Sequence, residues 1–215
     1  MNRYQRPAHL LAFALAALAG FIDALGFLQL GGLFVSFMSG NSTRLAVGLE
    51  AQSRVVPLAT LLIGCFVGGV IAGSLVSAAV PERQRKAAVL AVVAIMLLAA
   101  AASRYALGAT IVVATMAAAM GCANTVFQRE GEVSIGVTYM TGTLVKLGQR
   151  IADALRGGDR FGWTAYLLLW TSLVAGAVAG AASYARIGLG SLWLASAWAA
   201  ALSLVAWRTD FRTRR

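Results

Sequence analysis

The stretch VSFMSGNSTR, residues 35–44, directly follows an apolar run that is long enough to cross a bilayer, yet it is rich in hydroxyl groups. Hydrocarbon contains no water, so polar backbone and side-chain groups placed there must find partners within the protein. A polar, glycine-interrupted stretch at this place therefore predicts a broken or re-entrant helix. What its polar groups bind is the question that the rest of the chain has to answer.

The composition is that of a membrane protein. Of the 215 residues, 60% are hydrophobic and 12% are charged, and the mean hydropathy is +0.78, far from the values of an ordinary soluble domain. Six apolar runs approach the roughly 20 residues that span about 30 Å of hydrocarbon. They lie at about residues 8–30, 55–80, 87–103, 106–127, 162–185 and 189–207.

The stretch has a second copy in the chain. VSFMSGNSTRL (residues 35–45) recurs as VTYMTGTLVKL (137–147), and the preceding GFIDALGF (20–27) recurs as GCANTVFQ (121–128). Further on, GGVIAG (68–73) resembles AGAVAG (175–180). The matched positions include Asp23 with Asn124, Ser36 with Thr138, Gly40 with Gly142 and Arg44 with Lys146. An ordered series of this kind predicts an internal repeat.

Each half contains a long helix, a short polar-led segment and two more long helices. The short segments, about 35–50 and 137–156, are too polar to span at full depth, so we expect re-entrant or half-inserted helices. Three crossings per half invert the second half relative to the first. We therefore predict an all-α polytopic membrane protein, a single membrane domain over residues 1–215. It has six transmembrane helices, two short re-entrant or broken helices and an inverted repeat (about 8–104 and 106–208).

The basic residues indicate which way the chain faces. Its net charge is +10, but the basic residues lie between apolar runs, which is typical of positive-inside topology and argues against nucleic acid as a partner. Six crossings place 14 basic residues inside and 4 outside, and eight crossings place about 13 and 5, so charge alone scarcely separates the two models. Both chain ends are expected in the cytoplasm.

Asp23 is the one carboxylate well inside an apolar run, about 20 Å along its helix. Such residues usually face a bundle interior or a water-filled cavity. Asp23 is either a protonatable or cation-binding site, or half of a fixed interaction, such as an ion pair with Arg44 or a hydrogen bond at a helix end. Asn124 holds the equivalent place without a charge.

The two polar motifs complete the candidate solute or ion pathway. Arg44 and Lys146 could attract an anion or balance a carboxylate, or they could snorkel to headgroups. The remaining candidates lie at the expected helix starts, where they could cap first-turn amides or face a polar solute. These candidates are Ser39, Gly40, Asn41, Thr43, Thr141, Gly142 and Thr143.

Glycines at a spacing of four residues predict close helix packing, because small residues let helix backbones approach each other in lipid. They are Gly64, Gly68, Gly69, Gly73, Gly176 and Gly180. Cys65 and Cys122 lie inside apolar runs and His9 is the one histidine, so no metal site, cofactor or enzymatic site is expected.

The region from Gly20 to Leu45 resembles the signature region of the YoaK-like bacterial membrane proteins, a family of unknown function, and the likeness recurs around residues 139–142. The resemblance implies a multipass protein of the bacterial inner membrane with about six helices, and it implies no substrate. We expect a small-solute transporter or channel-like protein with a pathway between inverted halves. The alternative is a non-transporting scaffold, lipid-binding or accessory protein; an intramembrane enzyme is a weaker third option. The bilayer is the expected partner, and a small solute and a homo-oligomeric state are open.

Overall fold

The computed structural model describes residues 6–106, 108–129, 132–133 and 138–209 of the chain. Residue 137, where the second polar segment is predicted to begin, lies outside this part. The described chain is almost entirely helical, as expected for backbone that must satisfy its own hydrogen bonds in lipid. Its long helices are α1 (Arg6–Leu30), α3 (Val55–Ala79), α4 (Arg85–Ser103), α5 (Ala109–Ala123), α7 (Thr164–Ile187) and α8 (Leu192–Arg208).

Two further helices, α2 (Met38–Glu50) and α6 (Met140–Leu155), correspond to the polar segments predicted from the repeat. They have 13 and 16 residues and are called the short helices below, although α6 is one residue longer than α5. The other elements are small. They are the 3₁₀ turns η1 (Glu82–Gln84) and η2 (Gly188–Ser191) and an antiparallel pair of strands, β1 (Gln128–Arg129) and β2 (Glu132–Val133), in which Gln128 pairs with Val133. The sequence did not predict this strand pair.

Within the described residues, four helical stretches are long and apolar enough to cross a membrane: His9–Leu30, Val55–Ala79, Glu82–Ser103 and Thr164–Arg208. The last contains both α7 and α8, which η2 separates at Gly188, a residue with a φ of 54°. The run predicted at 106–127 forms only the 15-residue α5, because the chain leaves the helix in a turn after Ala123. The fold class is therefore confirmed as a helical membrane architecture, while six full crossings remain a prediction.

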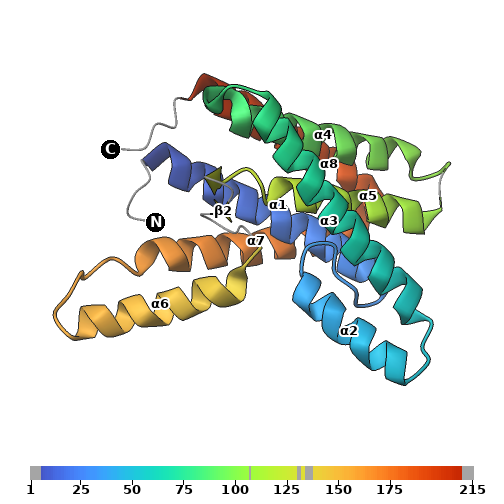
Figure 1. Ribbon diagram of the computed structural model, residues 1–215, viewed down its shortest axis with the longest axis horizontal. Helices are drawn as coiled ribbons and strands as arrows, with labels where there is room; N and C mark the ends of the chain where they lie inside the picture. Colours follow the sequence, from blue (N-terminus) through green and yellow to red (C-terminus); the bar gives the residue numbers. More distant parts are fainter. Residues whose placement is uncertain (1–5, 107, 130–131, 134–137, 210–215) are drawn as a thin grey trace.

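The helices pair across the halves of the chain. Helix α1 packs along α7, α3 packs along α5, and α4 packs along α8. In Figure 1, helices coloured blue to green therefore lie beside helices coloured yellow-green to red. The most buried large side chains come from these helices. They include Leu15, Leu18, Ile22, Leu62, Leu90, Leu97, Met116, Met120, Leu169 and Leu192. When the short helix of each half is counted, the first helix of each half (α1 or α5) thus packs on the third helix of the other half (α7 or α3).

Glycines allow the backbones of α1 and α7, and of α3 and α5, to approach each other closely. On α1, a Cβ at Gly20 would overlap the carbonyl oxygen of Leu173, and on α5 a Cβ at Gly121 would overlap the carbonyl oxygen of Phe66. The two contacts are equivalent in the repeat. Gly121 lies 101 residues after Gly20, and Leu173 lies 107 residues after Phe66, which are the offsets between the matched sequence segments. The repeated motifs therefore make equivalent backbone contacts.

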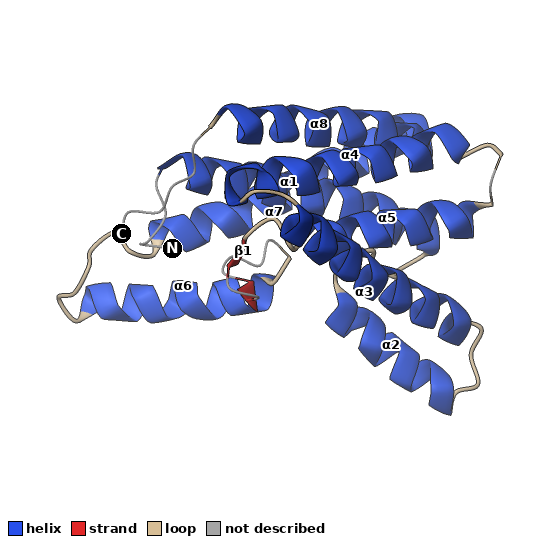
Figure 2. Cartoon of the chain, turned by 45° about the horizontal axis from the view of Figure 1, so that its top comes forward, coloured by secondary structure: helices blue, strands red, loops and turns tan. Residues whose placement is uncertain are grey.

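The two short helices lie outside this bundle. Helix α2 packs on α3, and α6 packs on α7. Figure 2 shows both projecting from the long helices, in different directions. Their positions matter for function because each begins beside a polar side chain from the first helix of its own half.

Candidate functional site

The first polar junction is built on Asp23, a half-buried residue in the second half of α1. Its Oδ1 accepts hydrogen bonds from the backbone amides of Val35 and Ser36, at 2.9 and 3.0 Å. Its Oδ2 accepts a hydrogen bond from the Ser36 hydroxyl at 2.8 Å. A carboxylate is an acceptor at both oxygens, so Asp23 ties the middle of the chain's first helix to the loop that leads into α2.

The loop can return to Asp23 because α1 ends in two glycines. Gly31 and Gly32 have φ angles of 63° and 119°, and the amide of Gly32 donates to the carbonyl oxygen of Phe27 at 3.0 Å. This is a Schellman-type helix end, in which a left-handed residue reverses the chain and satisfies a carbonyl of the last turn. The glycine pair therefore places Val35 and Ser36 within reach of Asp23.

The second junction repeats the first with neutral groups. The Thr138 hydroxyl donates to Oδ1 of Asn124 at 3.0 Å, and Nδ2 of Asn124 donates to the carbonyl oxygen of Met120 at 2.9 Å. Asn124 follows α5 directly, and both side chains are buried. The two pairs that the repeat matched, Asp23 with Asn124 and Ser36 with Thr138, therefore occupy equivalent places in the structure.

Asn41 holds the loop of the first half from the other side. Its Nδ2 donates to the carbonyl oxygen of Phe34 at 2.6 Å, and the amide of Phe34 donates to its Oδ1 at 3.0 Å. The side chain is fully buried, so these bonds satisfy polar groups that would otherwise be costly. The equivalent residue Thr143 instead donates its hydroxyl to the carbonyl oxygen of Tyr139, at 3.2 Å.

The predicted capping of the short helices by hydroxyl side chains is wrong. The residues before α2 and α6 are Phe37 and Tyr139, and neither helix has a side-chain cap hydrogen bond. Thr43 lies inside α2 and donates to the carbonyl oxygen of Ser39 at 3.2 Å, because Ser and Thr in a helix can bond to the preceding turn. The candidates Ser39, Thr141 and Gly142 are exposed, and Gly40 is half-buried against the Phe37 ring.

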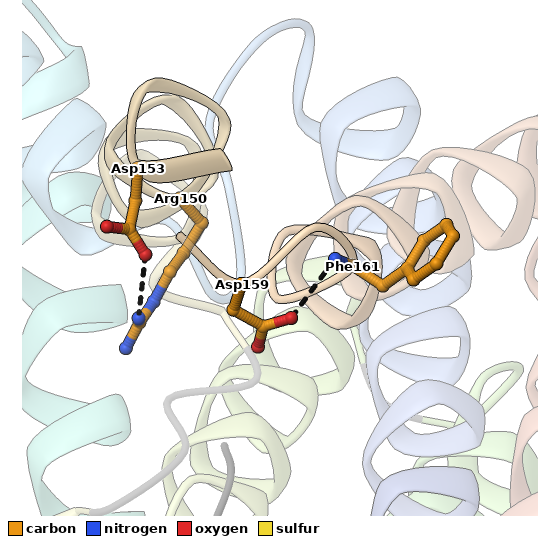
Figure 3. A network of polar contacts seen from close by, with 4 residues as sticks. All are labelled: Arg150, Asp153, Asp159 and Phe161. Carbon is orange, nitrogen blue, oxygen red and sulfur yellow. Dashed lines mark hydrogen bonds and ion pairs between the residues drawn. The ribbon is translucent and has the colours of Figure 1, made fainter. Parts of the chain in front are cut away.

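The cations of the two motifs lie apart from Asp23. Arg150 forms an ion pair with Asp153 at 3.8 Å (Figure 3). In the part of the chain that the structure describes, Arg44 forms no ion pair with Asp23 within 4.0 Å, so the alternative of an Asp23–Arg44 pair is wrong. Arg44 is exposed, and its guanidinium lies over Gly32, about 3.2 Å from where a Cβ would be. Lys146 is exposed and lines a hollow between α6 and α7.

The predicted packing glycines fall into two groups. Gly69 on α3 lies against the carbonyl group of Ala118, and Gly176 on α7 lies against that of Ala17. One turn further along the same helices, Gly73 lies against α5 and Gly180 lies against α1. By contrast, no other segment that the structure describes lies within 4 Å of a Cβ built on Gly64 or Gly68. Of the six predicted glycines, the other four therefore make the close helix contacts.

Several residues of these sites were not among the predicted ones. Ser36 and Thr138 bind the two junction side chains, and Gly20 and Gly121 make the closest helix contacts. The signal was present, because all four are matched positions of the repeat. In the described part of the chain, no three His, Cys, Asp or Glu side chains gather where they could hold a metal ion.

The sequence of the chain is similar to those of bacterial membrane proteins. Residues 11–205 match the family model described as "Protein of unknown function (DUF1275)". A UPF0700 transmembrane protein of Rhizobium meliloti (strain 1021) is 32% identical over 203 residues, 94% of this chain and 87% of the relative. The UPF0700 transmembrane protein YoaK of Bacillus subtilis (strain 168) is 32% identical over 144 residues, 64% of each chain. No solved structure matches the chain.

Proposed function

Since the chain belongs to the DUF1275 family of proteins of unknown function, we propose that it is a small-solute transporter or channel-like protein of the bacterial inner membrane, with a pathway between two inverted halves. Membrane location itself follows from the apolar helices and from relatives named as transmembrane proteins. The observation that carries the transport proposal is the pair of equivalent polar junctions, Asp23–Ser36 and Asn124–Thr138.

Each junction fixes the start of a short helix to the middle or end of a core helix. Discontinuous helices in two related halves are a recurring plan of transporters, in which broken-helix ends line the solute site. Here α2 and α6 are the broken elements. Three hydrogen bonds to Asp23 hold the chain before α2, and one hydroxyl hydrogen bond to Asn124 holds the chain before α6. A modest rearrangement at either junction would free polar backbone and side-chain groups for a solute.

Two observations support inverted halves. Contacts between the first and third helices are exchanged between the halves, with equivalent glycines at each seam. The start of α1 and the end of α8 also lie at the same end of the bundle (Figures 1 and 2), as an even number of crossings requires. With three crossings in each half, the second half runs opposite to the first.

A second candidate function rests on the close packing of the junctions, in which Asp23 is half-buried and the other three side chains are buried. Ser36, Asn124 and Thr138 are each less than 10% exposed, and no buried side-chain nitrogen or oxygen in the described residues lacks a hydrogen-bond partner. A transporter in a closed state would have this packing, and so would a scaffold or accessory protein that never opens. Motion of the junctions therefore distinguishes the two functions.

Thiol labelling in proteoliposomes tests this motion without knowledge of the solute. In a background with Cys65→Ala and Cys122→Ala, Ser36→Cys and Thr138→Cys are each exposed to a membrane-impermeant maleimide from one side at a time. If the protein alternates between open states, we expect slow labelling of the two positions from opposite sides. Labelling of neither position, with full labelling after denaturation, would support the scaffold and end the transport proposal.

The inverted arrangement predicts which loops face each side of the membrane. With six crossings, the loop at Ser53 lies outside and the loop at Gly158 lies inside, because each half contributes three crossings. In the same cysteine-free background, Ser53→Cys should react with impermeant reagent added to intact cells, and Gly158→Cys should react only after lysis. Reaction of both positions from one side would refute the inverted repeat, whatever the result at the junctions.

A further inference from the structure

Part of the hairpin formed by α6 and α7 is not covered by any other described segment of the chain. Helix α6 packs on α7, and Figures 1 and 2 show it projecting from the bundle. Along one side of this seam Ile151 and Leu155 are 40% and 84% exposed, and Phe161 in the connecting loop is 68% exposed. Along the other side lie Lys146 and Asp153. The seam therefore separates an apolar side of α6 from a charged side.

A hollow lies on each side of the seam. The charged one has a volume of about 260 Å³ and includes Lys146, Arg150 and Asp153. The apolar one has a volume of about 340 Å³ and is open on one side. Its lining is Ile151, Ala154, Leu155, Arg160 and Trp163. An apolar wall with one cation at its rim suits an amphiphilic anion.

The charges of the hairpin favour an anion. Asp153 pairs with Arg150 at 3.8 Å, and Oδ1 of Asp159 accepts the amide of Phe161 at 3.1 Å (Figure 3). Among the described residues, no carboxylate lies within 4.0 Å of Lys146, Arg156 or Arg160. The hairpin therefore carries three cations that no ion pair neutralises.

Trp163 is fixed beside one of these cations. Its Nε1 donates to the carbonyl oxygen of Arg160 at 3.0 Å, so the indole forms a wall of the same hollow that Arg160 lines. Trp side chains favour the level of the headgroups, where one edge is wet and the ring is apolar. Indole, cation and apolar helix side thus meet where a lipid has its phosphate and the top of its acyl chains.

We propose that the apolar hollow between α6 and α7 binds one anionic phospholipid, with its phosphate at Arg160 and an acyl chain along Ile151, Leu155 and Trp163. The inference is independent of transport, because it concerns a lipid-facing groove and not the polar junctions. Free phosphate would use the cation but not the apolar wall. A zwitterionic lipid would use the wall but gain less from the cation. An anionic phospholipid uses both.

Quenching of Trp163 by brominated lipids tests the site in the full-length protein. Native protein and Trp163→Phe are reconstituted in phosphatidylcholine vesicles with increasing fractions of dibrominated phosphatidylglycerol or dibrominated phosphatidylcholine. The difference between the two proteins isolates Trp163 among the five tryptophans. We expect brominated phosphatidylglycerol to reach half-quenching at a mole fraction roughly fivefold lower than brominated phosphatidylcholine does. This is the effect of about one cation near an anionic surface.

Three variants make the result specific. Arg160→Gln should bring the two lipids to equal quenching, whereas Arg160→Lys should retain most of the preference. Arg186→Gln removes the same charge from an exposed position in the last turn of α7 and should retain all of it. Millimolar inorganic phosphate should leave the quenching unchanged.

Equal quenching by the two lipids in the native protein would overturn the site. So would an unchanged preference in Arg160→Gln, or an equal loss in Arg186→Gln, which would indicate only general attraction to an anionic surface. Relief of quenching by inorganic phosphate would show that the cation takes a phosphate group without the lipid.

Discussion

Gly69→Ala should lower the free energy of unfolding by roughly 1–3 kcal/mol, the usual cost of adding a methyl group to a well-packed interface. The new Cβ would overlap the carbonyl oxygen and the Cα of Ala118 on α5. These are backbone atoms, so they cannot move aside without shifting a helix. The seam between α3 and α5 would therefore have to widen along its length.

The neighbouring glycine provides the matched control. Gly68 lies on the same helix, one residue earlier, and a Cβ at this position would have no atom of another described segment within 4 Å. Gly68→Ala should leave stability unchanged or raise it by up to about 1 kcal/mol, because alanine favours a helix over glycine. Unfolding by sodium dodecyl sulfate in mixed micelles, followed by circular dichroism, measures both variants. Equal effects at 68 and 69 would contradict the packing described for α3.

Asp23→Ala should be the most destabilising change at the polar junctions, by about 3 kcal/mol, because it leaves three hydrogen-bond donors of Val35 and Ser36 without their acceptor. A second effect acts on the unfolded chain. In a micelle-unfolded chain Asp23 would be in contact with hydrocarbon or detergent at a cost. Its removal thus stabilises the unfolded chain as well.

The equivalent residue of the second half is the comparison. Asn124→Ala removes one acceptor for the Thr138 hydroxyl and one donor bond to Met120, so its cost should be about 1 kcal/mol, as for neutral hydrogen bonds. Ser36→Ala should cost about as much. Midpoints of the same detergent unfolding experiment rank the three variants. If Asp23→Ala cost no more than Asn124→Ala, the carboxylate would not be what holds the first junction.

The most informative sequence feature was the internal repeat. Its matched positions identified both short helices within a few residues and paired Asp23 with Asn124, whose hydrogen bonds are equivalent in the structure. Repetition succeeds here because two copies that keep the same residue types at the same spacing make the same local contacts. The repeat also contained Gly20 and Gly121, whose role becomes visible only once the opposite helix is placed.

Three features could not be predicted from local pattern. The extent of α5 depends on where the chain turns after Ala123, and apolarity continues past that point. The clamp between Asn41 and Phe34 depends on how a loop returns to a helix. Hydroxyls at the start of α2 suggested capping, but the helix begins two residues too early for Ser39 to be its N-cap. The hydroxyls of Ser42 and Thr43 bond to carbonyl oxygens within the helix instead. In each case tertiary geometry decides between local alternatives.

The exchange of helices between the halves has a consequence for biosynthesis. While the first half is being inserted, α1 and α3 stand in the bilayer with their glycine faces uncovered, because the partners of both, α7 and α5, are made later. Contacts between segments so distant in the chain form late in folding. The glycine face of α3 can be covered once α5 is made, by residue 123, whereas that of α1 stays uncovered until translation has passed residue 187. For most of its synthesis the nascent chain therefore exposes a glycine face to other membrane helices.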